Sequence, residues 1–140
     1  MGRDAVVFRN VRSLEGQFGE GLFEVDEHTG GASPKPGHEV VGLAWEDAFA
    51  ANIYLGNSAT VVWLRLTIES ILGTGSFIVE RVLSAGVRCG DKLELHELPR
   101  LCEELDVLRT KGIADLLPFV ESMESLVTAA KREHNPIVLT

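Results

Sequence analysis

The stretch GNSATVVWLRLTIESILG, residues 56–73, decides the fold because two hydrophobic periods compete in it. A strand would place on one face the apolar residues Val62, Leu64, Leu66 and Ile68. A helix would gather instead Val61, Leu64, Ile68, Ile71 and Leu72. Asn57 or Ser58 can cap the start of a helix, and Gly73 can end it. Together with the i,i+4 spacing of Arg65 and Glu69, these signals favour a helix over residues 57–72, whereas a strand would change the sheet order.

Two amphipathic helices follow in the last third of the chain. The first begins near Pro99, ends before Gly112, and has the apolar stripe Leu98, Leu101, Cys102, Leu105 and Leu108. The second begins at Asp115 with Pro118 in its first turn, and its buried stripe is Leu116, Val120, Met123, Val127 and Ala130. Asn135-Pro136 ends it, and the β-type run 137–140 is expected to return to the sheet.

The first half is read as β-structure. Asp4 to Phe8 and Gly21 to Val25 are expected strands of a meander, separated by a turn over residues 13–20. Residues 28–37 are rich in glycine and proline, which predicts an exposed loop. Glu39 to Trp45 and Ala51 to Leu55 are expected to pair as a hairpin. Between the central helix and the last third, Ser76 to Ala85 suggests a short helix, and Lys92 to His96 a short strand or connector.

These elements predict one α+β domain over residues 1–140. We expect an antiparallel or mixed sheet from the first half and the carboxyl end, covered on one face by about three helices. With 140 residues, the chain can bury an ordinary hydrophobic core without a metal or a disulfide. No cofactor is expected, and Cys89 and Cys102 are predicted to be free thiols, with Cys102 buried.

Charge and hydropathy narrow the classes of function. The formal net charge is −8, which opposes binding to a phosphate backbone. No apolar run is long enough for a signal peptide or a membrane span. The sequence therefore predicts a soluble, cytoplasmic protein that binds neither nucleic acid nor membrane.

No motif fixes a reaction. Asp26-Glu27-His28 and His96-Glu97 place an imidazole beside carboxylates, which suits a metal or an acid–base site. The first group is equally explained as a solvated strand end, and the second as the polar start of a helix. Arg88 and nearby glycines could activate Cys89, but no base or oxyanion site is recognisable. Nucleophile-elbow and phosphate-loop patterns are absent from the sequence. We therefore expect no catalytic and no metal-binding residues, and an enzyme is the less favoured reading.

Acidic residues are concentrated between Asp91 and Asp106. This stretch contains six acidic and two basic residues, and it supplies half of the net charge of the chain. On the predicted helix, Glu103, Glu104 and Asp106 form an exposed acidic face. Such a face attracts a basic protein partner through long-range steering, although it also serves simply to solvate a helix. We take these three residues as the candidate partner-binding site.

The later part of the chain resembles small bacterial immunity proteins of toxin–immunity systems. The resemblance rests on the passage IYLGNS at residues 53–58, the run FIVERVLSAG at 77–86, the helix 98–109 with EELDVLR, and the last helix ending in Ala-Ala-Lys before the final strand. It covers roughly the last 90 residues. It implies a non-catalytic protein that binds a toxin and blocks its active site, and it assigns no binding residue.

Two alternatives remain open. One is a small enzyme or ligand-binding domain with a pocket near Trp45, Tyr54, Trp63 and His96. The other is a homodimer in which Trp63 or Phe119 is exposed at a symmetric patch.

Overall fold

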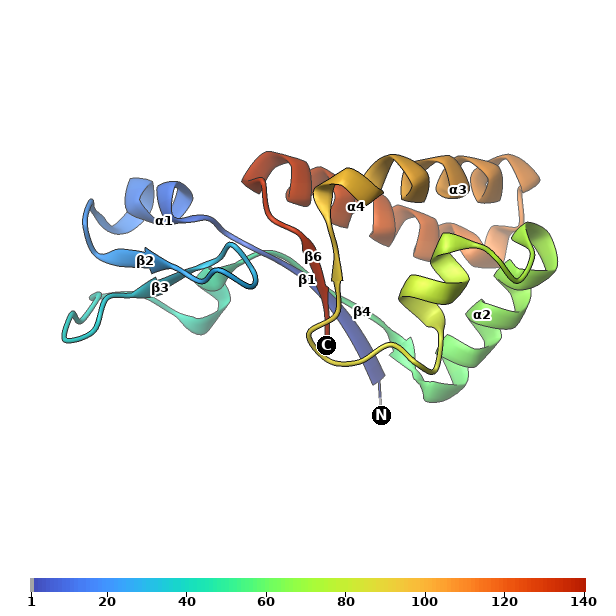
Figure 1. Ribbon diagram of the computed structural model, residues 1–140, viewed down its shortest axis with the longest axis horizontal. Helices are drawn as coiled ribbons and strands as arrows, with labels where there is room; N and C mark the ends of the chain where they lie inside the picture. Colours follow the sequence, from blue (N-terminus) through green and yellow to red (C-terminus); the bar gives the residue numbers. More distant parts are fainter. Residues whose placement is uncertain (1) are drawn as a thin grey trace.

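A four-stranded antiparallel sheet forms the centre of the molecule. In the computed structural model, which describes residues 2–140, the strand order is β4-β1-β6-β5 (Figure 1). The strands are β1 (Gly2–Phe8), β4 (Phe49–Asn57), β5 (Lys92–Leu93) and β6 (Ile137–Leu139). β1 lies between β4 and β6 because its segment Ala5 to Val7 is apolar and buried. The C-terminal run therefore returns to the sheet, as predicted.

The ambiguous stretch is a helix, α2 (Ser58–Leu72). The Asn57 side chain accepts a hydrogen bond from the Thr60 backbone N–H, and the Gly73 N–H donates to the Glu69 carbonyl. Gly73 has φ of +90°, a conformation that favours glycine. Val61, Leu64 and Ile68 are buried, so the helical period is the one that the core uses.

The two helices of the last third are confirmed as α3 (Leu98–Lys111) and α4 (Leu117–Glu133). α4 lies against β1 and β4, α2 contacts the same two strands, and α3 packs against α4. All five apolar residues of the predicted second stripe are buried. Cys102 is half-buried beside the core rather than fully buried, and both cysteines are free thiols. The predicted α+β class, with helices covering one face of the sheet, is confirmed (Figure 1).

Short helical segments connect these elements. The expected helix after Ser76 is present as a single helical stretch that includes a π-helical turn at Val79–Leu83. Lys92 to His96 divides into β5 and a 3₁₀ turn at Leu95–Glu97. Two more 3₁₀ turns are Trp45–Ala48 and Ala114–Leu116.

The N-terminal third differs most from expectation. The predicted turn over residues 13–20 is a helix, α1 (Val11–Phe18), because Asn10 caps the Ser13 N–H and Leu14 is buried. β2 (Phe23–Val25) pairs with β3 (Ala32–Pro34), not with β1, so there is no meander in this region. β3 lies inside the predicted loop at residues 28–37.

The expected hairpin between Glu39 to Trp45 and Ala51 to Leu55 is also wrong. Residues 39–44 form turns and extended backbone without strand pairing, and Val41 is 88% exposed. β4 pairs with β1 instead, because its Ala51 and Ile53 pack with Ala5 and Val7 against the helices. Across residues 2–140, the structure contains no helix that is long and apolar enough to span a bilayer.

Candidate protein-interaction site

Among residues 2–140, the outward side of α2 leaves a large part of three apolar side chains exposed. Val62, Trp63 and Leu66 are 43%, 44% and 57% exposed, and we name these three residues the α2 outer face. They lie at i, i+1 and i+4, opposite the buried Val61, Leu64 and Ile68. α2 is thus apolar on both sides, which is why its sequence also fits a strand period. An amphipathic helix would carry polar residues at these outer positions.

A small cavity adjoins this surface. It has a volume of about 170 Å³, and α2, β4 and the start of α4 line it, with Tyr54, Trp63, Pro118 and Phe119 among its residues. Ligand pockets for small molecules usually have roughly 300–1,000 Å³. The volume suits a single side chain better than a cofactor.

The predicted aromatic pocket forms only in part. Tyr54 and Trp63 line the same cavity, but His96 and Trp45 do not. Trp45 packs edge-on against Phe49, with ring centroids 4.8 Å apart. Phe119 is buried, so of the two aromatics proposed for a symmetric patch only Trp63 is exposed. The structure therefore does not bring the histidine to the aromatic residues.

The acidic residues of α3 fall into two groups. Glu103 and Asp106 are exposed, as predicted, whereas Glu104 is half-buried. The Glu104 carboxylate accepts hydrogen bonds from Ser76 Oγ at 3.0 Å and from the backbone N–H groups of Phe77 and Ile78 at 2.8 and 2.9 Å. It satisfies the free N–H groups at the start of the helical stretch after Ser76. Helical periodicity alone gave no signal for this contact, which joins residues 26 to 28 positions apart.

Asp26 and His28 have structural partners in the loop between β2 and β3. Asp26 Oδ1 accepts hydrogen bonds from the backbone N–H groups of His28 and Thr29, and these bonds hold the pKa of Asp26 below its usual value. His28 Nε2 lies 3.0 Å from the carbonyl oxygen of Gly90. Within residues 2–140, His, Cys, Asp and Glu side chains form no group of three or more that could hold a metal ion.

His96 is exposed, and its neighbour Glu97 is bound to Arg81. Burial raises the pKa of Glu97. Hydrogen bonds from Arg81 and from the Glu94 N–H, together with the Arg81 charge, lower it by more than burial raises it, so the pKa of Glu97 is below its usual value. Arg81 also donates to the carbonyl oxygen of Lys92 at 2.8 Å. This arrangement ties the stretch after Ser76 to the start of α3, which is a structural role.

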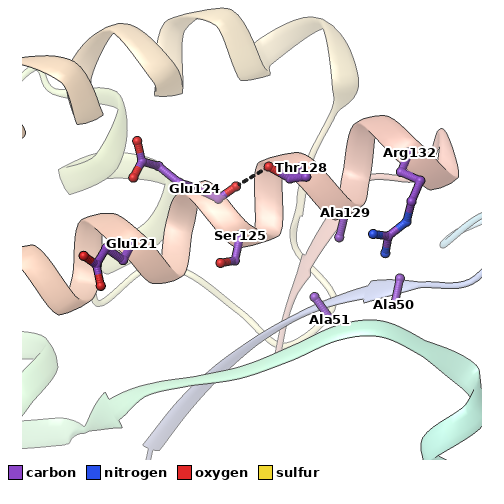
Figure 2. A pocket seen from close by; sticks show the side chains of 8 residues that line it. All are labelled: Ala50, Ala51, Glu121, Glu124, Ser125, Thr128, Ala129 and Arg132. Atoms are coloured by element: carbon purple, nitrogen blue, oxygen red, sulfur yellow. Dashed lines mark hydrogen bonds between the residues drawn. The ribbon is translucent and has the colours of Figure 1, made fainter.

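A groove along the outer edge of β4 was not expected from the sequence. It has a volume of about 510 Å³ and lies between β4 and α4 (Figure 2). Its lining comprises Ala50, Ala51, Glu121, Glu124, Ser125, Thr128, Ala129 and Arg132. The absence of charged residues from residues 49–57 is the one sequence signal that could have indicated it.

Comparison with known proteins found no counterpart: no protein-family model matches the chain, and no match was found among curated proteins or solved structures. Three surfaces therefore bear on function. They are the α2 outer face, the exposed acidic pair Glu103 and Asp106, and the β4–α4 groove.

Proposed function

We propose that this chain is a non-catalytic protein-binding domain that docks a partner protein through the α2 outer face. The observation that carries the proposal is the exposure of Val62, Trp63 and Leu66 on a helix whose other side already fills the core. Contiguous exposed apolar residues often belong to interaction sites, and tryptophan is enriched among residues that dominate binding energy. The adjoining cavity beside Trp63 offers room for one side chain of the partner.

The charge of the chain favours a basic partner. The net charge is −8, and Glu103 and Asp106 remain exposed on α3. Negative potential steers a cationic protein toward its docking site and loses strength as salt is added. Glu104 contributes less to the exposed acidic surface of α3, because its carboxylate accepts hydrogen bonds from Ser76, Phe77 and Ile78.

The narrower form of the proposal is an immunity-type inhibitor of a bacterial toxin acting in the cytoplasm. It is supported by the resemblance in residues 53–58, 77–86 and 98–109 and by the acidic composition. In this form the chain occupies the active site of a basic toxin without performing chemistry itself.

The test is affinity capture from the native cell lysate at low and moderate salt, with Leu66→Asp as the diagnostic variant. The matched control is Val41→Asp, which places the same charge at another exposed apolar residue. We expect one basic protein to be retained by the wild type and by the control, and lost with Leu66→Asp. Neutralising Glu103 and Asp106 together should weaken retention mainly at low salt.

Two results would overturn the proposal. One is a specific protein that Leu66→Asp retains as well as the wild type does. The other is the absence of any specific protein, together with a small molecule that co-purifies and raises the melting temperature unless Trp63 is replaced by alanine. That second result would favour a ligand-binding domain built around the Tyr54–Trp63 cavity.

A further inference from the structure

β4 is an edge strand whose outer side has no partner strand among residues 2–140. Asp4 of β1 exchanges backbone hydrogen bonds with Thr140, so its N–H and C=O point away from β4. Because these groups alternate in direction along a strand, Ala5 and Val7 direct their N–H and C=O toward β4, where they pair with Ile53 and Ala51. The intervening Asn52 therefore directs its N–H and C=O to the open edge.

The two edges of the sheet are protected differently. β5, at the opposite edge, is only two residues long, and short edge strands resist pairing with another chain. β4 has nine residues, Phe49–Asn57, without a charge or a proline. Its register is irregular only near Ala50 and Leu55, so residues 51–54 form a regular, unprotected segment.

The helix beside this edge has a charge pattern that is complementary to itself. α4 presents Glu121, Ser125, Thr128 and Arg132 to the groove, with spacings of three, four and seven residues on one face (Figure 2). The acidic residue lies toward the start of the helix, the basic residue at its end, and small side chains lie between them. Two such helices packed antiparallel bring Glu121 of each copy opposite Arg132 of the other.

α4 and β4 run in opposite directions, which aligns the two elements in one symmetric contact. Ala50 and Ala51 share the groove with Arg132, whereas Leu55 shares the next cavity with Pro118 and Phe119. The middle of the α4 stripe therefore lies near Asn52, the middle of the regular edge segment. One two-fold axis at Asn52 therefore relates both the pair of β4 strands and the pair of α4 helices.

We propose that the β4–α4 groove binds a second copy of this chain, with β4 added antiparallel to β4 of the second copy and α4 packed against α4 across the same two-fold axis. The sheets of the two copies then form one continuous eight-stranded sheet. Backbone hydrogen bonds at Asn52 supply the strand contact. Arg132 Nε already donates to Glu133 Oε2 at 3.3 Å within the chain, so its terminal guanidinium nitrogens form the pairs with Glu121 of the second copy. Two such Glu121–Arg132 pairs fix the register, and the small Ser125 and Thr128 allow the helices to approach. This surface is distinct from the α2 outer face.

The self-complementary charge selects a second copy over an unrelated strand. A foreign peptide at this edge would have to supply matching side chains of its own in one register. A second copy supplies them directly, because the two-fold axis that pairs β4 with β4 also places Glu121 of each copy opposite Arg132 of the other. Glu124 does not disturb this pattern, because it is already paired with Arg109 of α3 within the chain.

The test is sedimentation equilibrium of the purified chain over a wide concentration range. We expect a reversible dimer, and we expect Glu121→Arg or Arg132→Glu alone to raise its dissociation constant about tenfold or more, because each change places like charges together twice. The double variant, which exchanges the two charges, should restore the dimer. Glu103→Arg is the matched control on α3 and should leave the dissociation constant unchanged.

Asn52→Pro tests the strand contact separately. The substitution removes only an N–H that points to the open edge, and proline is tolerated at such positions of an edge strand. We therefore expect a folded monomer by circular dichroism and sedimentation. A wild-type chain that stays monomeric, or a double variant that fails to recover the dimer, would overturn the proposal. Loss of a captured foreign protein with Asn52→Pro in a monomeric wild type would assign the edge to that protein instead.

The outcome is independent of the proposed function. Leu66→Asp changes the α2 outer face and should leave the dimer intact, whereas Asn52→Pro should leave partner capture through the α2 outer face intact. Either inference can therefore fail without the other.

Discussion

The N-terminal lobe, residues 10–48, and the body formed by the rest of the described chain are stabilised in different ways. The body buries the inner faces of α3 and α4 and the inner residues of the sheet in one apolar cluster. In the lobe, Leu14 and Phe23 are the only buried large apolar side chains, and neither belongs to that cluster. The difference indicates that burial holds the body, while the lobe depends on caps, turns and its attachment to the body.

The attachment is largely polar. The Asn10 N–H donates to Glu133 Oε1 and its side-chain amide donates to the Glu133 carbonyl, at 3.1 and 2.8 Å. His28 Nε2 lies 3.0 Å from the Gly90 carbonyl oxygen. Lys92 Nζ donates to the His28 carbonyl at 3.0 Å. Both the C-terminal end of α4 and the β5 strand thus hold the lobe against the body.

The largest expected effect separates lobe from body with one type of substitution. Leu105→Ala in the body should lower the free energy of unfolding by about 2–5 kcal/mol, because it leaves a cavity in the core. Leu14→Ala in the lobe should lower it by less than about 1 kcal/mol, because the lobe opens locally before the body unfolds. Urea denaturation followed by Trp63 fluorescence, in a Trp45→Phe background, measures both. Equal losses would mean that lobe and body unfold as one unit.

The next effect tests whether polar contacts also stabilise the body. Glu104→Gln should cost about 1–3 kcal/mol, because backbone N–H groups of Phe77 and Ile78 lose a charged acceptor. The neighbouring Glu103→Gln should change stability by no more than about 0.5 kcal/mol, because Glu103 is exposed. Thermal unfolding of the two variants gives the comparison. Similar melting temperatures would show that the Glu104 contacts add no net stability.

A somewhat smaller effect is expected where the lobe joins the body. Asn10→Ala removes the cap of α1 and the side-chain bond to Glu133, at a cost of about 0.5–2 kcal/mol. We expect the loss as faster amide hydrogen exchange within residues 11–48, with the core of α4 still protected. Faster exchange throughout α3 and α4 would instead make Asn10 part of the body.

The smallest effect is a pH dependence in the body. The pKa of Glu97 is lower in the folded chain than its ordinary value of 4.5, so the unfolded chain binds the proton more readily. The stability that Glu97 contributes is therefore present above about pH 4.5 and is lost as the pH falls through the folded pKa. The stability difference between wild type and Glu97→Gln should be constant from pH 6 to 8 and should shrink below about pH 4.5. A difference that grows in acid would contradict this sign.

The two regions also differ in how well the sequence predicted them. α2, α3 and α4 follow from caps and apolar spacing, which are set by residues three or four positions apart. α1 was missed because Gly16 and Gly19 suggested a turn, whereas the cap at Asn10 and the buried Leu14 favoured a helix. The predicted meander and hairpin were wrong because strand pairing joins distant segments, and β1 pairs with β4 across more than forty residues.

The candidate surfaces divide in the same way. The acidic character of Glu103 and Asp106 could be read from the sequence, but the engagement of Glu104 by Ser76 could not. The apolar outer positions of α2 were visible in residues 56–73 as the competing strand period. That they remain uncovered depends on where every other helix packs.

The sequence by itself determined the α+β class, the long helices, the returning C-terminal strand and the acidic charge, because local spacing and composition encode them. The tertiary structure alone decided the partner of each strand, the open edge of β4 and the exposure of Trp63 and Leu66. Strand partners and uncovered faces depend on contacts between residues far apart in the chain. Competition among all such contacts selects them, so local patterns leave them open.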